Sequence, residues 1–208
     1  MKFSIVVSDN PWVFSDKLNM SSTKRGADAN YSTLTTKELC NLPVNQITDP
    51  DGSILALWTP SSLLPQGLEI LNAWGFVLKT TYIWCKTKKE KNNKKITIDD
   101  CLSFGMGRTF RAAHEIALIG INNTGIYKQL ENRSQRSVSF APNLKHSQKP
   151  EHLQDSLDLM FPLPKDGTIN RVELFARRER KGWLTLGNEC PSSMNEDIKV
   201  SLEKLING

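Results

Sequence analysis

The sequence KFSIVVSDNPW, residues 2–12, decides the fold that we expect for this chain. Its first part has the apolar, β-branched composition of a buried strand, and it runs directly into Asp9, Asn10, Pro11 and Trp12. Pro11 has no N–H and drives the preceding residue into an extended conformation, so the backbone must leave the sheet here. The carbonyl of Asn10 then has no strand neighbour. An acceptor, a carboxylate and a flat ring therefore converge at the end of a strand, where open α/β sheets bind ligands.

These groups suit the exocyclic amine of a nucleobase. Such an amine is a poor nucleophile because its lone pair is delocalised into the ring, and two acceptors that take its hydrogens would let it attack an electrophile. The Asp9 carboxylate and the Asn10 carbonyl are two such acceptors, and Trp12 would stack on the base with about 1–3 kcal/mol. The alternative is a strand capped by a tight Asn-Pro turn with Trp12 in the core, and these residues alone favour that alternative.

Composition bounds the class of protein. A chain of 208 residues with 38% hydrophobic content is long enough for one sizeable core, and we expect one domain. A net charge of +5 suits a polyanionic partner, although an ordinary basic protein explains it nearly as well. No apolar run has the length of a membrane span and no signal peptide is evident, so we expect a cytoplasmic protein. The four cysteines show no C-x-x-C spacing, so we expect reduced thiols and no metal site.

Strands and helices alternate along the rest of the chain. Predicted strands follow at 53–59, 76–86, 116–121, 137–141, 170–176 and 183–187. The helix between the first two begins at Ser61 or Ser62, buries Leu64, Leu68 and Leu71, and stops at Gly75. This alternation predicts an α/β fold with a mostly parallel sheet flanked by helices.

Three more helices are predicted from their capping residues. Thr35 and Glu38 form a capping box for a short helix that Pro43 ends. Ser147 begins a helix whose first turn holds Lys149 and Pro150 and whose buried stripe is Leu153, Leu157, Met160 and Phe161. Ser193 and Glu196 form another capping box, before an amphipathic helix with Ile198, Leu202, Leu205 and Ile206 on its apolar side. We expect this last helix to dock on the body of the protein.

Two polar, basic stretches are predicted to be loops at the same rim as Asp9. Residues 13–34 contain Lys24 and Arg25, and residues 87–110 follow the strand at 76–86. The second stretch holds the lysine cluster Lys88, Lys89, Lys91, Lys94 and Lys95. Both could contact phosphates, and for both the alternative is a solvated loop whose charges bind nothing. His114, taken alone, is most simply a structural histidine.

Several stretches in a single order resemble the MT-A70 family, and the likeness covers residues 2–189. They are Asp9-Asn10-Pro11-Trp12; Tyr31-Ser32-Thr33-Leu34 with Leu42-Pro43-Val44; Leu57-Trp58; Trp74-Gly75-Phe76 with Lys79-Thr80-Thr81; Arg111-x-x-His114-Glu115; His146-Ser147-x-Lys149-Pro150; and Glu173-Leu174-Phe175-Ala176-Arg177 to Gly187-Asn188-Glu189. Members of this family are S-adenosylmethionine-dependent adenine N6 methyltransferases, acting on eukaryotic messenger RNA or on bacterial and phage DNA.

The resemblance implies a Rossmann-like methyltransferase fold in permuted order, with the catalytic strand first and the cofactor strand near the C-terminus. It implies a methyltransferase domain at 1–190, with loops 13–34 and 87–110 over the active site, and a C-terminal helix at 191–208. Asp9, Asn10, Pro11 and Trp12 would hold the target amine. S-adenosylmethionine would contact Asp9, Lys149, Glu173, Arg177, Asn188 and Glu189. Nucleic acid would contact Lys24, Arg25, Tyr31, Lys88, Lys89, Lys91, Lys94, Lys95, Arg108 and Arg111.

The substrate that we expect is DNA, because a compact member is similar to the phage and bacterial enzymes, and we expect a monomer or homodimer. An RNA methyltransferase and a non-catalytic nucleic-acid-binding subunit are the alternatives.

Two departures from the family pattern bear on the chemistry. Asn10 replaces the first proline of the usual Asp-Pro-Pro-aromatic motif, which concerns rate more than reaction type. Residues 178–181 lack the histidine and asparagine that some relatives set against the ribose, so we expect modest cofactor affinity.

Overall fold

The computed structural model of this chain describes residues 1–14, 33–88, 102, 109–143 and 148–208. Their strands form one seven-stranded sheet in the order β5-β3-β4-β2-β1-β6-β7. The strands are β1 (Ile5–Asp9), β2 (Ile54–Thr59), β3 (Val77–Thr87), β4 (His114–Ile121), β5 (Val138–Pro142), β6 (Arg171–Leu174) and β7 (Leu184–Leu186). β4 pairs antiparallel with both of its neighbours, and every other pairing is parallel. The predicted α/β fold with a mostly parallel sheet is confirmed.

β1 lies in the middle of the sheet, between β2 and β6. Its registers place Asp9 beside Trp58 and Ser8 beside Leu174, so the ends of the three strands lie at one edge. Val6 belongs to the core on one face, while Ile5 and Val7 belong to the core on the other. A strand covered on both faces requires a continuous apolar run, which is the composition that predicted it.

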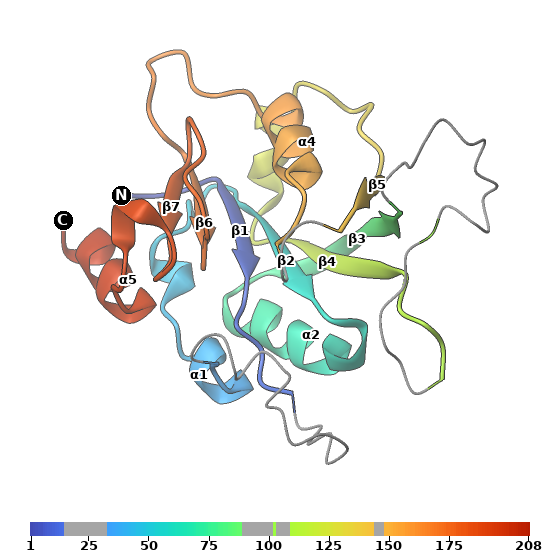
Figure 1. Cartoon of the computed structure of the whole chain (residues 1–208). Helices are drawn as coiled ribbons and strands as arrows, with labels where there is room; N and C mark the ends of the chain where they lie inside the picture. Colours follow the sequence, from blue (N-terminus) through green and yellow to red (C-terminus); the bar gives the residue numbers. More distant parts are fainter. Residues whose placement is uncertain (15–32, 89–101, 103–108, 144–147) are drawn as a thin grey trace.

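Helices cover both faces of the sheet, as Figure 1 shows. The helices are α1 (Thr36–Cys40), α2 (Leu64–Ala73), α4 (His152–Met160) and α5 (Ile198–Asn207), with single 3-10 turns at η2 (Val44–Gln46), η3 (Ser61–Leu63), η4 (Thr124–Gln129) and η5 (Pro191–Ser193). One core joins α1, α2 and α5 to the sheet, and the other joins α4 and η4 to the opposite face. No helix in these described ranges is long and apolar enough to cross a membrane.

The capping box at Thr35 is confirmed, because its hydroxyl accepts from the Glu38 N–H and Glu38 accepts from the Thr35 N–H. The other helix starts differ from the predictions. Neither Ser61 nor Ser62 caps α2, which follows a 3-10 turn and has a proline in its first turn instead. Leu68 is 37% exposed, since Gly67, Ile70 and Leu71 form the buried face.

Two further helices begin later than their serines predicted. α4 begins at His152 with Glu151 as its N-cap, so Lys149 precedes the helix and does not lie in its first turn. α5 is capped by Asp197, whose side chain accepts from the Lys199 N–H at 2.8 Å. Ser193, the predicted cap, instead exchanges hydrogen bonds with the backbone of Gly187. A cap signal in sequence cannot show that the hydroxyl is already engaged by another turn of the chain.

Candidate active site

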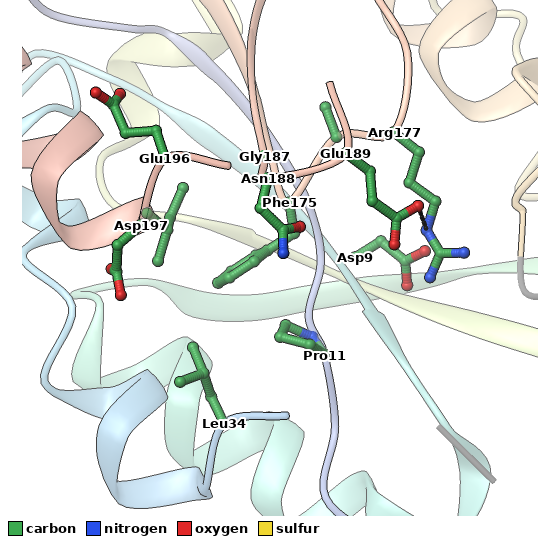
Figure 2. A pocket seen from close by; sticks show the side chains of 12 residues that line it. Asp9, Pro11, Leu34, Phe175, Arg177, Gly187, Asn188, Glu189, Glu196 and Asp197 are labelled. Atoms are coloured by element: carbon green, nitrogen blue, oxygen red, sulfur yellow. Dashed lines mark ion pairs between the residues drawn. The ribbon is translucent and has the colours of Figure 1, made fainter. Parts of the chain in front are cut away.

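The carboxyl ends of β1, β6 and β7 meet at one edge of the sheet, and a hollow opens there. Its empty volume, which includes open solvent, is about 640 Å³. Its lining comes from the end of β1, the residues that follow β6 and β7, and the start of α5: Asp9, Pro11, Leu34, Phe175, Ala176, Arg177, Gly187, Asn188, Glu189, Glu196, Asp197 and Ile198. In Figure 2, the side chains of Phe175 and Asn188 project into this space from the middle of one wall. We call it the first hollow.

A second hollow lies on the other side of Asp9, between the end of β1 and the segment that leads into α4. It is lined by Asp9, Trp58, Gln148, Lys149, Gln154, Glu173, Phe175, Arg177 and Arg178. Three residues line both hollows, namely Asp9, Phe175 and Arg177. The predicted catalytic carboxylate therefore lies where the two spaces meet.

Asp9 is held by Lys149. The Lys149 ammonium lies 2.9 Å and 3.1 Å from the two carboxylate oxygens of Asp9, and 3.1 Å from Glu115 on β4. Glu115 also pairs with Lys86 of β3 at 2.7 Å. Positive and negative groups thus alternate from the end of β1 to the end of β3, and the Lys149 ammonium also lies 5.8 Å from the centre of the Trp58 ring.

The charges in this row stabilise one another. Burial alone would lower the pKa of Lys149, but the Asp9 and Glu115 carboxylates outweigh it and raise that pKa above its ordinary value. Burial would likewise raise the pKa of Glu115, but Lys149 and Lys86 outweigh it and lower that pKa. Lys149 is therefore a fixed cation at neutral pH, and Glu115 is a fixed anion.

Glu173 differs from these carboxylates. Burial raises its pKa above the ordinary value, and a hydrogen bond from the Gln154 amide at 3.2 Å offsets this only in part. Two polar atoms of the second hollow's lining are buried without a hydrogen-bond partner among the described residues: the Gln154 amide oxygen and the Trp58 indole nitrogen. Buried polar atoms normally have partners, so this lining is suited to a polar ligand.

The Asn-Pro turn differs from its prediction in two ways. The Asn10 carbonyl is not wholly unpaired, because it accepts from the Trp12 N–H at 3.0 Å, although a carbonyl oxygen has a second lone pair. The Trp12 ring is not an open stacking surface: it is 6% exposed, belongs to the core, and donates from its indole nitrogen to the Trp58 carbonyl. The side-chain oxygen of Asn10 accepts from Ser8 at 2.6 Å, and its amide nitrogen is buried without a partner in the described chain.

The wall between the hollows contains a constrained backbone. Phe175 follows β6 with φ of +58°, in the left-handed region that costs a residue other than glycine roughly 1–2 kcal/mol. Gly187 follows β7, and a Cβ placed there would lie 2.2 Å from the Ala176 carbonyl oxygen, so only glycine fits. Strained residues cluster at ligand sites, and the ring of Phe175 projects into the first hollow.

Arg178 holds the segment that carries Lys149. Its guanidinium donates to the Lys149 carbonyl at 3.1 Å and pairs with Glu151 at 2.7 Å. Arg180 pairs with Glu151, Asp155 and Asp158. The stretch 178–181, which has no histidine or asparagine, thus fastens α4 and the residues before it to the end of β6.

Apart from Asn10, Pro11 and Trp12 of the Asn-Pro turn, the predicted site residues fall into three groups. Asp9, Lys149, Glu173, Arg177, Asn188 and Glu189 come together around the two hollows. Lys88 and Arg111 are exposed at the end of the β3–β4 pair, beyond its last paired residues Cys85 and His114. Lys24, Arg25, Tyr31, Lys89, Lys91, Lys94, Lys95 and Arg108 lie outside the described residues.

Sequence reasoning missed several residues of the site. Glu115 belongs to a family-like motif but was given no role, and Trp58, Gln154 and Arg178 were not proposed as site residues. The sequence assigned no role to Asp197, because it lies in the tail and the predicted helix cap there was Ser193. A carboxylate directly before an apolar helix was the available signal.

Among α/β proteins, this arrangement defines the class that binds its ligand at the carboxyl ends of parallel strands. The MT-A70 family model matches residues 3–189. This chain therefore belongs to the MT-A70 family of N6-adenine methyltransferases, and the predicted resemblance and enzyme class are confirmed.

Individual relatives are distant. The chain is similar to the type II methyltransferase M.MunI of Mycoplasma sp., at 27% identity over 94% of this chain and 81% of that protein. It is 28% identical to the human N(6)-adenosine-methyltransferase catalytic subunit METTL3, over 90% of this chain but 28% of that protein. An MT-A70-like N(6)-adenosine-methyltransferase of Arabidopsis thaliana is 26% identical, over 90% of this chain and 24% of that protein.

Proposed function

We propose that this protein transfers a methyl group from S-adenosylmethionine to the exocyclic N6 amine of adenine in DNA. The observation that carries the proposal is Asp9, the carboxylate at the junction of two hollows, held by an ammonium 2.9 Å away. DNA is favoured because the likeness extends over 81% of M.MunI, a type II methyltransferase, but over only 28% of the human adenosine methyltransferase. RNA remains the second candidate, since the two identities are nearly equal.

The residues present fit the cofactor. The first hollow combines apolar side chains, Pro11, Leu34, Phe175 and Ile198, with polar groups, which suits a nucleoside. The second hollow has Lys149 and Arg178 for a carboxylate, and Asp9 and Gln154 as acceptors for an ammonium. We infer that the nucleoside end occupies the first hollow and the amino-acid end the second. The reactive centre then lies beside Asp9.

The chemistry follows from this placement. The cofactor supplies an electrophilic methyl group. Asp9 and the second lone pair of the Asn10 carbonyl accept hydrogen bonds from the two N–H groups of the amine, which returns electron density to its nitrogen. When bound, the cofactor would supply the methyl carbon that the amine attacks and would keep the electron pair of the broken carbon–sulfur bond. The methylated amine would then lose one proton, for which Asp9 is the nearby acceptor. Lys149, itself paired with Glu115, orients the Asp9 carboxylate before the reaction and has no part in bond making.

The non-catalytic subunit is less well supported. A protein that only holds nucleic acid has no use for a buried lysine fixed between two carboxylates at the end of β1. Burying charges is costly even when they are paired, and Gln154 and Trp58 add polar atoms next to them that have no hydrogen-bond partner among the described residues. Both features support a ligand-binding, catalytic centre.

The test is incubation with methyl-labelled S-adenosylmethionine and, separately, unmethylated DNA and unmethylated RNA, followed by nucleoside analysis. We expect label in N6-methyldeoxyadenosine and little in N6-methyladenosine. Label only in N6-methyladenosine would overturn the DNA assignment and leave the reaction type intact. Label in cytosine, or none with either polymer, would overturn the reaction itself.

A further inference from the structure

The family match ends at residue 189, but residues beyond 189 also line the first hollow. Glu196, Asp197 and Ile198, at the start of α5, line the same space as Asp9 and Asn188. α5 is fixed there, because Ile198 and Leu202 are buried in the core that lies under the sheet. In Figure 2 this segment faces Phe175 across the hollow, on the side away from Asp9. The tail is therefore a structural part of the site.

The two acidic residues of this segment differ in what their carboxylates contact. Glu196 accepts from the Ser201 hydroxyl and pairs with Lys204, both of which belong to α5. These hydrogen bonds lower the pKa of Glu196. Figure 2 shows it turned away from Phe175. Asp197 uses one oxygen, Oδ1, to cap α5 at the Lys199 N–H. Its other oxygen has no hydrogen-bond partner among the described residues.

The position of Asp197 fits one end of the ligand. Under the proposed function, the reactive centre lies beside Asp9, and the ribose lies near Arg177 and Asn188. The purine then lies farthest from Asp9, between the ring of Phe175 and the apolar side chains of Leu34 and Ile198. The exocyclic amine of a purine donates hydrogen bonds, and a carboxylate oxygen accepts them strongly.

We propose that Asp197 is a specificity-determining residue of the cofactor site, accepting the exocyclic amine of the cofactor's adenine. The segment 196–198 thus serves as the nucleoside-end wall, although it lies outside the family match. A carboxylate here favours a 6-amino purine over a 6-oxo purine, because the oxo group would face it without a hydrogen to donate. This inference rests on the proposed function.

The experiment compares two ligands and three proteins by calorimetry. The ligands are S-adenosylhomocysteine and S-inosylhomocysteine, which differ at position 6 of the purine: the first has an amine there, and the second has an oxo group together with a hydrogen on the adjacent N1. The proteins are the parent, Asp197→Asn and, as a matched control, Glu203→Gln, which makes the same charge change at an exposed residue of α5 that lines neither hollow. Asparagine caps helices as well as aspartate does, so α5 keeps its start.

We expect the parent to prefer the adenosyl compound by at least tenfold. Asp197→Asn should bind that compound about tenfold more weakly, the loss that one charge-assisted hydrogen bond represents, and should lose most of the preference. Glu203→Gln should keep the parental preference. An unchanged preference in Asp197→Asn, with thermal melting showing a folded protein, would overturn the inference and leave the proposed function standing. Failure of the parent to bind either compound would overturn the cofactor assignment and this inference with it.

Discussion

Lys149 lies between Asp9 and Glu115, and its side chain is 14% exposed. The hypothesis made from sequence gave it one partner, the carboxylate of a cofactor. The structure adds two partners within the protein, contributed by β1 and β4. Lys149 therefore has a structural role as well as its proposed binding role, and the two roles can be separated by pH.

Lys149→Met should lower the free energy of unfolding by about 2 kcal/mol at pH 7, because two partly buried carboxylates lose their cation. Lys149 has a raised pKa, so its contribution is present at all pH values below its ordinary 10.5. Glu115 has a lowered pKa, so its contribution is present above its ordinary 4.5 and is lost as the pH falls further. The deficit of the variant should thus shrink below about pH 4.5, as urea unfolding measured across pH can show.

The control for this prediction is Lys204→Met. Lys204 also pairs with a carboxylate but is 66% exposed, so its loss should change stability by under about 1 kcal/mol. A Lys149→Met deficit that stays constant as the pH falls from 7 to about 2 would show that lost packing, and not lost charge, causes it. S-adenosylhomocysteine should also bind Lys149→Met more weakly than the parent.

Asn10→Pro restores the proline of the usual family motif. We expect the folded variant to keep or exceed the parental methylation rate, because only the carbonyl at this position accepts from the target amine and proline fixes its direction. The substitution also removes an amide nitrogen that is buried without a partner among the described residues. Steady-state rates with both substrates saturating test this. A folded but inactive variant would show that the Asn10 side chain takes part in the reaction.

At the scale of elements, α4 illustrates what local sequence can and cannot predict. Of its predicted buried stripe, Leu153, Leu157 and Phe161 are buried and Met160 is partly buried, because helical spacing of apolar residues is a local signal. Its start was predicted too early. Arg178 and Arg180, which follow β6 in the chain, bind the residues around the start of α4, and no local pattern encodes such partners.

Arg178→Gln should weaken S-adenosylhomocysteine binding by about tenfold, since the cofactor's carboxylate loses one of its two proposed cations, and the Lys149 carbonyl and Glu151 lose the guanidinium that holds them. With cofactor at saturation, the methylation rate should stay within about twofold of the parent, as expected for a residue that contacts the cofactor away from the reacting atoms. Lys181→Gln, an exposed lysine in the same stretch, is the control and should change neither value. A rate loss at saturation would indicate that Arg178 contacts the reacting groups.

The same limit applies to the strands. The apolar runs of β1 and β2 predicted their place in a doubly covered sheet, and Asp9 was predicted to lie at the ligand edge. The direction of β4 was not predictable, since periodicity gives the buried faces of a strand but not the sense in which it runs. The left-handed Phe175 and the close approach of Gly187 to Ala176 arise only when β6 and β7 pair.

At the scale of the whole molecule, the net charge of +5 remains a weak argument for a polyanionic partner. The lysine cluster of residues 88–95 gives a specific segment in which the contribution of positive charge to binding can be tested. Replacing Lys91, Lys94 and Lys95 with serine should reduce the salt slope of log K for duplex DNA by about 0.9 for each phosphate that the protein no longer neutralises. Fluorescence anisotropy across a salt series measures the slope.

The matched control removes the same charge elsewhere. Lys165, Lys181 and Lys199 are exposed and lie outside the predicted loops. Their replacement with serine should weaken binding slightly, through net charge alone, with little change in slope. Equal slopes for both triple variants would indicate that the lysine cluster is only solvated.

The central claim is that the Asp9 carboxylate accepts a hydrogen bond from the target amine as charge develops in the transition state. The most direct measurement is the single-turnover methylation rate of Asp9→Ala, made alongside calorimetry with S-adenosylhomocysteine and with Asp51→Ala as an exposed control. The predicted result is a folded protein whose rate falls by about 10²–10³ at saturating cofactor. Cofactor affinity should also fall, because Asp9 is proposed to accept from the ammonium of the cofactor, but it should fall by less than the rate at saturation, which reports stabilisation of the transition state alone. Methylation by Asp9→Ala at the parental rate would contradict the claim.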